Sequence, residues 1–354
     1  MLNRGVLSLL IVALGLLVPP GLTAPVDAQT TIIVDDDFFN CVNGLTPNWY
    51  TISAAVADAN PGDTIRVCEG DYTEPSMTIS DDYLTITGPG ATPENDGVAT
   101  VHHNGVSSAM FTIHADYVVL QGLDLDATPP WGFGGAMTIG IENHGSSVAI
   151  EHNEIRNATS AAVSVSGSPA PSAVQVLFNN IHDNTDAVVC YCDDSDVAGN
   201  TVNVTDRALE LVGDGGNVTN NVFVNGRVVA NGDDLFISTN QISGPGVSPL
   251  LSVSGSRVGV TDNTLSDAAG YGIQAQPGST STSVTIGRNT FTNINRPIRL
   301  QDSNPGDAFT LTATIGGSQA EANTFVESGG TLGDSNYLVQ MDGPTIDVNA
   351  EYNK

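Results

Sequence analysis

Aspartates recur in this chain at intervals that fit a row of metal ligands. Asp193 and Asp194 are followed one repeat later by Asp214, and after another repeat by Asp233 and Asp234. If the intervening segments form coils stacked about 4.8 Å apart, these carboxylates lie one above another. Like charges at that spacing repel unless they are protonated or bridged, and calcium accepts about six to eight oxygen ligands. The pattern predicts a calcium site, and a solvated acidic turn is the alternative.

The coils themselves follow from an asparagine-centred unit that occurs seven times between residues 150 and 291. In each copy an Asn lies between two apolar positions, as in Val176-x-x-Asn179-x-Ile181. Successive copies are 19 to 26 residues apart, a period typical of stacked-coil solenoids. Asn tolerates the left-handed backbone of a tight bend, and its amide can bond the matching amide one coil away. We therefore predict a structural ladder of Asn153, Asn179, Asn200, Asn221, Asn240, Asn263 and Asn289.

A second pattern begins about eight to eleven residues after each Asn. Two aliphatic residues bracket one other residue, as in Val163-Ser164-Val165. In a strand, the outer members of such a triplet point to one side and the middle member to the other. Together with two short strands around each Asn, this predicts three short parallel strands per coil. The predicted outward column contains Gly140, Ser164, Val189, Glu210, Ala230, Ser252, Gln274 and Arg299, and Val229 is assigned to the interior.

The charge of the chain excludes several classes of partner. Its 354 residues include 39 acidic and 10 basic side chains, the formal net charge is −29, and the one lysine is Lys354. Proteins that bind nucleic acids concentrate Lys and Arg, and the same requirement applies to anionic membranes. An excess of carboxylates fits a saline habitat or a cation-loaded surface, so we expect salt or divalent ions to stabilise the fold.

Residues 1–28 have the features of a secretory signal peptide. Arg4 gives a positive start, residues 6–18 form a short apolar run, and Val26-Asp27-Ala28 offers small residues before a cleavage point. The run is too short to span a membrane comfortably, and no later stretch is apolar enough to do so. We predict cleavage after Ala28 and a secreted, extracellular protein without a membrane span. An uncleaved N-terminal anchor is the alternative.

Residues 29–82 are expected to close the first coil. Apolar positions at helical spacing in residues 52–59 predict a short amphipathic helix over the end of the solenoid, which would otherwise expose strand edges. Disulfides are expected in an exported chain, and we predict a bridge between Cys41 and Cys68, which flank this segment. Cys190 and Cys192 fall on one inward face and are predicted to be buried thiols, because a Cys-x-Cys bridge along a strand is strained.

The sequence YTISAAVADANPGDTIRVCEGDYTE (residues 50–74) resembles the opening of secreted right-handed parallel β-helix proteins of the pectin-lyase-like superfamily. YLTITG (83–88), YVVLQGLDL (117–125) and the asparagine-centred units resemble the repeats of that superfamily. The resemblance covers the chain from about residue 30 to its end. It implies an all-β protein, a right-handed parallel β-helix with three short strands per coil and an N-terminal capping helix. We assign residues 29–82 to the cap and first coil, 83–325 to the repeats, and 326–354 to a C-terminal cap or tail.

The same resemblance suggests where a ligand would bind. In enzymes of that superfamily the active groove runs along the sheet of the second pattern, which places Tyr191, Glu210, Gln274 and Arg299 in a carbohydrate groove. The residue sets of polygalacturonases and pectin methylesterases have no clear match in this chain. Glu142 and Glu210 are three coils apart, about 14 Å, whereas two-carboxylate hydrolysis needs roughly 5–9.5 Å.

We therefore expect a secreted carbohydrate-contacting or surface protein without an identifiable catalytic set. A polysaccharide-active enzyme, either a pectate-lyase-like lyase or a glycoside hydrolase, is the first alternative, and a passive structural module is the second. An extracellular polysaccharide is the expected partner, nucleic acid is excluded, and calcium is the one cofactor that the sequence suggests. The sequence does not determine the oligomeric state.

Overall fold

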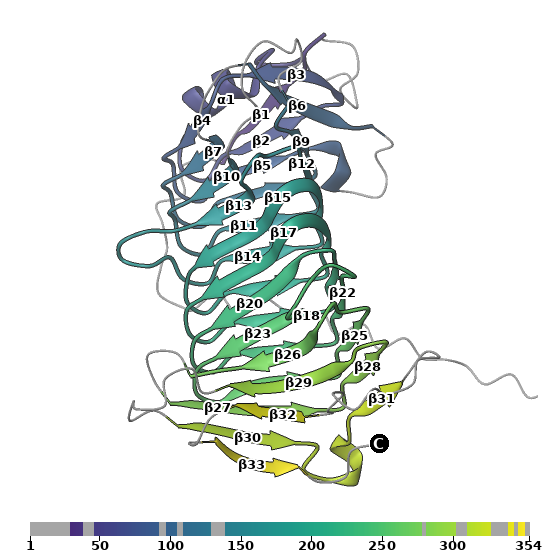
Figure 1. Ribbon diagram of the computed structural model, residues 1–354. Helices are drawn as coiled ribbons and strands as arrows, with labels where there is room; N and C mark the ends of the chain where they lie inside the picture. The colour runs from purple at the N-terminus through teal and green to yellow at the C-terminus, as the bar shows by residue number, and fades with distance from the viewer. Residues whose placement is uncertain are drawn as a thin grey trace, which may run out of the picture.

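The computed structural model describes residues 29–37, 46–91, 97–104, 109–128, 139–277, 281–301, 310–326, 339–342 and 346–350. The predicted signal peptide and Cys41 lie outside these residues, so secretion and the Cys41–Cys68 bridge stay predictions. The described chain is an elongated stack of coils that runs from β1 and α1 at one end to β33 at the other (Figure 1). No helix among the described residues is long and apolar enough to cross a membrane.

One ladder of short strands is a thirteen-stranded parallel sheet, here called the first ladder. Each strand between the two ends pairs in register with the strand one coil earlier and the strand one coil later, as Val176 does with Ile150 and Val197. Its strands are β1 (Thr31–Val34), β2 (Thr64–Val67), β5 (Thr85–Thr87), β8 (Val119–Gln121), β11 (Ala149–Glu151), β14 (Gln175–Leu177), β16 (Asp196–Ala198), β18 (Asn217–Thr219), β21 (Phe236–Ser238), β24 (Val258–Thr261), β27 (Thr282–Gly287), β30 (Leu311–Ile315) and β33 (Ile346–Ala350).

The second ladder contains the strands that follow each repeated Asn. It pairs β3 with β6 and continues in parallel to β31. Its strands are β3 (Gly70–Glu74), β6 (Ala99–His103), β9 (Asp124–Asp126), β12 (Glu154–Arg156), β15 (Asn180–Tyr191), β17 (Thr201–Val212), β19 (Val222–Val224), β22 (Gln241–Ser243), β25 (Thr264–Ser266), β28 (Thr290–Thr292) and β31 (Thr324–Val326).

The third ladder contains the strands of the second sequence pattern. The long strands β15 and β17 belong to both the second and third ladders and join them into one twenty-stranded sheet. The other strands of the third ladder are β4 (Met77–Ile79), β7 (Ala109–Ile113), β10 (Ile139–Asn143), β13 (Ala161–Val165), β20 (Arg227–Asn231), β23 (Leu251–Ser254), β26 (Tyr271–Ala275), β29 (Arg296–Gln301) and β32 (Val339–Asp342). Because β32 and β33 pair with earlier coils, the ladders extend into the segment assigned to a C-terminal cap or tail.

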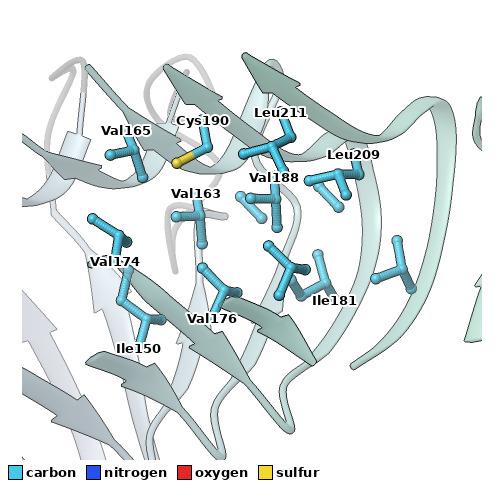
Figure 2. Packing of buried hydrophobic residues seen from close by; sticks show 14 of the residues in the cluster. Ile150, Val163, Val165, Val174, Val176, Ile181, Val188, Cys190, Leu209 and Leu211 are labelled. Carbon is cyan, nitrogen blue, oxygen red and sulfur yellow. The ribbon is translucent and has the colours of Figure 1, made fainter. Parts of the chain in front are cut away.

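The core is a set of aliphatic columns between the ladders. Val163 of β13, Val188 of β15 and Leu209 of β17 are register neighbours and are fully buried. Figure 2 shows them facing Ile150 and Val176 of the first ladder across the interior. Burial of one such side chain stabilises a fold by about 1.5–3 kcal/mol, so each coil adds stability only when its neighbours cover it.

The Asn ladder runs along the inside of a bend between the first and second ladders. The side-chain oxygen of Asn221 accepts hydrogen bonds from the backbone and side-chain nitrogens of Asn200, both at 2.9 Å. The side-chain nitrogen of Asn221 donates to the carbonyl of Val197 at 2.8 Å and to Asn240 Oδ1 at 3.0 Å. Equivalent bonds join each asparagine from Asn153 to Asn289 with the next, and Asn323 extends the ladder.

Helix α1 (Ile52–Asp58) packs its buried residues against the first coil. Thr51 provides the N-cap, because its side chain accepts a hydrogen bond from the backbone nitrogen of Ala54. The fully buried Glu74 of β3 accepts further bonds from the backbone nitrogens of Ile52 and Ser53, at 2.6 and 3.1 Å. A carboxylate at this position complements the partial positive charge of a helix start and fixes α1 on the second ladder.

Cys190 and Cys192 form a disulfide, so the prediction of two free thiols is wrong. The prediction assumed that both residues belong to one extended strand. Strand β15 ends at Tyr191, and the chain turns at Cys192, which brings the two Cα atoms to 5.4 Å. That separation lies within the usual range for disulfides. Both residues are buried, as predicted from their shared face.

A bulge changes which side chains face outward. Arg207 pairs with Arg227, but Leu209 pairs with Val228, so β17 contains one residue more than β20 between these pairs. In consequence Ala230 is fully buried and Val229 faces outward, the reverse of the prediction. At the other end of the column the partner of Ser164 is Glu142, not Gly140.

Candidate functional site

The residues predicted to form a carbohydrate groove lie on the outward face of the third ladder, but not together. Gln274 and Arg299 are register partners on β26 and β29. Glu210 is three strands away in the same column, about 14 Å at the usual coil spacing. The register partner of Glu210 is Val189. Tyr191 lies two residues after Val189, in the next outward column, and is 46% exposed. The structure therefore brings together only Gln274 and Arg299.

Gln274 and Arg299 belong to a polar surface on three successive strands, which we call the glutamine–arginine surface; it consists of Tyr271, Gln274, Arg296, Arg299 and Gln340. The guanidinium carbons of Arg296 and Arg299 lie 5.5 and 4.8 Å from the centroid of the Tyr271 ring. The Tyr271 hydroxyl accepts a hydrogen bond from Arg296 at 3.0 Å and donates to Gln340 at 3.3 Å. The ring therefore gathers groups from β26, β29 and β32.

Further side-chain bonds hold this surface in one arrangement. Gln274 donates to Gln276 at 2.8 Å and to Gln301 at 3.2 Å, so three amides form a row. Asp342 accepts bonds from Gln340 and from Arg299, and these bonds hold the pKa of its carboxyl below the ordinary value. The result is a preorganised set of amide and guanidinium groups, which donate and accept hydrogen bonds in fixed directions.

Glu210 lies in a separate ion-pair cluster. The Arg207 guanidinium contacts Glu210 and also Asp186, whose Oδ2 is 2.6 Å from Nη2. The backbone nitrogen of Arg207 donates to Asp186 Oδ1 at 3.0 Å. The hydrogen bond to Asp186, which is 3% exposed, is the main reason that the pKa of Arg207 is raised. These contacts fix the bulge between β15, β17 and β20 and leave Glu210 paired.

The aspartates predicted to bind calcium form a ladder of their own in the turn after the third ladder. Asp193 Oδ1 accepts a hydrogen bond from the backbone nitrogen of Asp214 at 2.9 Å. Asp214 accepts in the same way from Asp233 at 2.7 Å, and Asp233 accepts from Ser256 at 2.7 Å. Each of these carboxylates thus accepts one hydrogen bond from a backbone nitrogen of the next coil, much as the side chain of an Asx turn accepts a bond from a nearby backbone nitrogen.

The two remaining residues of that prediction, Asp194 and Asp234, adopt left-handed φ angles of 50° and 57°. Asp234 pairs with Arg257, and the hydrogen bond from this arginine lowers the pKa of the Asp234 carboxyl. Within the described part of the chain, the one group of three or more acidic, histidine or cysteine ligand atoms that lie within 4.8 Å of one another is elsewhere, at Asp35–Asp37. Calcium at the aspartate ladder stays a prediction.

The sequence interpretation missed a charged cluster on the outward face of the second ladder. We call it the acid–histidine patch; it consists of Asp124 and Asp126 of β9, Glu154 and Arg156 of β12, and His182 of β15. Arg156 contacts all three carboxylates, with Nη2 3.0 Å from Asp124, Nε 3.3 Å from Asp126 and Nη1 2.9 Å from Glu154. Register places these residues on adjacent coils, so one guanidinium links neighbouring strands.

His182 extends the patch by one coil. Its Nε2 lies 3.0 Å from Glu154 and its Nδ1 2.7 Å from Asp183. Burial lowers the pKa of His182, but the hydrogen bonds to Asp183 and Glu154 outweigh burial, and the net pKa is raised. The histidine therefore favours its charged form, which suits a position between two carboxylates.

The two aspartates of the patch differ in acidity. Burial raises the pKa of Asp124, and the charge of Arg156 offsets this only in part. Burial acts on Asp126 as well, but hydrogen bonds from Asn157 and Thr128 outweigh it and lower the pKa of Asp126. Oδ1 of Asp124 is buried and has no hydrogen-bond partner among the described residues. Neighbouring carboxyls whose pKa values move in opposite directions are typical of acid–base sites.

A signal for this patch was present in the sequence. Each contributing strand contains a triplet with an inward aliphatic residue between two outward polar ones: Asp124-Leu125-Asp126, Glu154-Ile155-Arg156 and Asn180-Ile181-His182. The sequence interpretation assigns these strands only to the scaffold and places the polar groove on the third ladder. Alternation along the second ladder would have identified the patch.

The first ladder has a shallow hollow of about 330 Å³, lined by residues such as Arg257, Gly259 and Thr285. Gly259 is the register partner of Phe236, which is 45% exposed and lies beside the space that a larger residue would fill. The hollow lies on another ladder from both the glutamine–arginine surface and the acid–histidine patch, so it does not correspond to the predicted groove.

Comparison with known proteins agrees with the architecture. A family model described as a right-handed β-helix region matches residues 200–325. No curated protein is similar to the chain in sequence. The chain therefore has a right-handed parallel β-helix fold, as the resemblance implied.

Several solved structures have the same fold. A pectate lyase superposes with a TM-score of 0.52 at 14% identity, covering 91% of this chain and 79% of the lyase. The A-module of a mannuronan C-5 epimerase from Azotobacter vinelandii gives 0.53 at 15% identity, covering 90% of this chain and all of the module. DFA-IIIase from Arthrobacter chlorophenolicus A6 gives 0.53 at 14% identity, with coverage of 81% and 84%. At these identities the likeness shows the fold alone.

Proposed function

We propose that this protein is secreted and contacts an extracellular polysaccharide through the glutamine–arginine surface. The observation that carries the proposal is the set of amide and guanidinium groups on three successive coils, fixed around Tyr271 by mutual hydrogen bonds. Groups already held in place lose little conformational entropy when a ligand binds. A row of donors and acceptors spaced by the coil repeat suits a ligand that is itself a repeating chain of hydroxyl groups.

A neutral polysaccharide fits the charge of the molecule best. The net charge of −29 opposes the approach of an anionic chain. The two arginines of the surface are already engaged with Tyr271 and Asp342. Amides form hydrogen bonds with neutral hydroxyl groups without needing a counter-charge. We therefore expect the row of Gln274, Gln276 and Gln301 to bind the polysaccharide.

The test is retention of the full chain in native gels that contain a neutral polysaccharide, compared across a panel of neutral and anionic glycans. Gln274→Ala should weaken binding about tenfold, which corresponds to one lost hydrogen bond of about 1.4 kcal/mol. Gln175→Ala is the matched control, because Gln175 is an exposed glutamine on the first ladder. Equal retention of the two variants, or no retention of the unmodified chain on any glycan, would refute the proposal.

A second candidate function, glycoside hydrolysis, is favoured by the unequal aspartates of the acid–histidine patch. The protonated form of Asp124, favoured by its raised pKa, would give its proton to the leaving oxygen as the glycosidic bond breaks. Ionised Asp126 would take a proton from the attacking water. Outward residues two apart on a strand are separated by about 6.6 Å, which is near the lower end of the range for inverting hydrolysis.

This second function predicts new reducing ends from a polysaccharide, where binding alone predicts none. Activity should fall as pH rises through the raised pKa of Asp124, and also as pH falls through the lowered pKa of Asp126. Asp124→Asn should abolish product, whereas Asp262→Asn, which removes a carboxylate paired with Arg288 in a turn beside the first ladder, should not. Undiminished product from Asp124→Asn would exclude the patch, and a passive structural module would show neither binding nor product.

A further inference from the structure

We propose that Asp35, Asp36 and Asp37 bind one hard divalent cation, calcium in the first instance, at the N-terminal end of the solenoid. The three residues follow β1 directly, and their ligand oxygens all lie within 4.8 Å of one another. The site is separate from the aspartate ladder, the glutamine–arginine surface and the acid–histidine patch, so it does not depend on the proposed function.

The strongest observation is the state of Asp35. Its side chain is completely buried, and the one bond that Oδ1 accepts from the described residues is long, 3.3 Å from the backbone nitrogen of Asp37. Oδ2 has no hydrogen-bond partner among the described residues. No arginine or histidine in the described part of the chain forms an ion pair with Asp35. A buried carboxylate without compensation is strongly unfavourable, and a bound cation would supply the missing charge.

Asp36 is held in place beside it. Its Oδ2 accepts a hydrogen bond from the backbone nitrogen of Asp71 at 3.1 Å, which fixes the carboxylate against the start of β3. Gly70 leaves the space for this approach, because a Cβ at that position would overlap the Asp36 carboxylate. Asp36 thus joins the end of β1 to the start of the second ladder.

The buried Tyr72 beside the cluster does not donate its hydroxyl proton to the carboxylates. Its hydroxyl donates to the carbonyls of Cys68 and Val34, at 3.0 and 3.4 Å, rather than to a carboxylate.

The donor set and its dimensions favour calcium. All three ligands are carboxylates, which hard cations prefer over the nitrogen and sulfur ligands that suit zinc and copper. Two ligands of one ion are separated by at most twice the bond length, about 4.6–5.2 Å for calcium, and the three ligand atoms lie within 4.8 Å of one another. Three carboxylates also give enough negative charge to hold a divalent ion, and water completes its shell.

The test uses the full chain after exhaustive chelation, with calcium as titrant in calorimetry and terbium as a luminescent probe excited through nearby aromatic residues. Asp36→Asn keeps the acceptor for the Asp71 amide but removes one ligand charge, and it should weaken calcium binding at least about tenfold. Asp81→Asn makes the same charge change in the N-terminal segment outside the cluster and should leave binding unchanged. Absence of calcium binding in the unmodified chain would overturn the proposal.

Melting temperature gives a second readout that distinguishes a metal site from general damage. With chelator present, Asp36→Asn should be at least as stable as the unmodified chain, because it removes repulsion between carboxylates. With calcium present, the order should reverse, because only the unmodified chain binds the ion tightly. The same order in both conditions would contradict the site. Loss of binding in Asp214→Asn, with Asp36→Asn unaffected, would place the calcium at the aspartate ladder instead and would also overturn the proposal.

Discussion

Replacing Asn221 with alanine should destabilise the fold strongly without affecting a surface site. The side chain takes part in four hydrogen bonds, two donated to Val197 and Asn240 and two accepted from Asn200. At about 1 kcal/mol each, their loss amounts to about 4 kcal/mol. The change also leaves the Asn200 amide and the Val197 carbonyl without these partners in the interior, and a buried unpaired group costs roughly 1–3 kcal/mol.

Urea denaturation followed by both circular dichroism and fluorescence would measure this loss. Asn203→Ala is the matched control, because Asn203 is exposed on β17 and accepts one bond, from Asn225 at 3.1 Å. We expect the control to change stability by no more than about 0.5 kcal/mol. If the two variants unfold at the same urea concentration, the Asn ladder does not stabilise the coils. Loss of polysaccharide binding by a normally stable Asn221→Ala would show that the residue has a functional role instead.

Two further predictions concern backbone space and pH. Gly255→Ala should lower the melting temperature markedly, because φ at Gly255 is +122° and a Cβ would overlap the Gly232 carbonyl. Gly246→Ala is the control and should hardly change the melting temperature, because a Cβ there meets open space. Equal melting temperatures of the two variants would contradict this packing. The raised pKa of His182 means that its contribution to stability is complete below the ordinary value of about 6.5 and is lost as pH rises through the folded-state pKa. The melting-temperature difference between the unmodified chain and His182→Gln should therefore shrink between pH 6 and pH 9, and a constant difference would show that the imidazolium is not involved.

The architecture could be predicted because a solenoid repeats the same physical problem in every coil. Each bend buries backbone polar groups that a side chain must satisfy, and the recurrence of Asn therefore indicated both the period and the register. The left-handed backbone that we expected at these Asn lies instead on the residue before each of them, as at His152 (φ 56°) and Phe178 (φ 55°). The predicted register was wrong where a strand contains an extra residue. The bulge between Arg207 and Leu209 moved Val229 outward, and spacing alone does not distinguish an extra residue in a strand from one in a turn.

The candidate sites were harder to predict because their members come from different coils. Gln274 and Arg299 were correctly placed on adjacent strands, but Tyr271 was not singled out, since its role depends on two arginines one coil later. The Cys190–Cys192 bridge depended on where β15 ends, which is a property of the turn and not of the alternation.

The stacking of coils also explains why no contiguous sequence motif indicates the acid–histidine patch. Its members lie about 26 to 30 residues apart in sequence, yet parallel register places Asp124, Glu154 and Asn180 in one column and Asp126, Arg156 and His182 in the next. A contiguous motif places groups along one strand, whereas a β-helix places them across strands about 4.8 Å apart. In this fold, polar residues at the same register position in successive coils are therefore a better guide to a site than any local sequence. Applied to the second ladder, that criterion selects the patch where the pKa values of two neighbouring aspartates move in opposite directions.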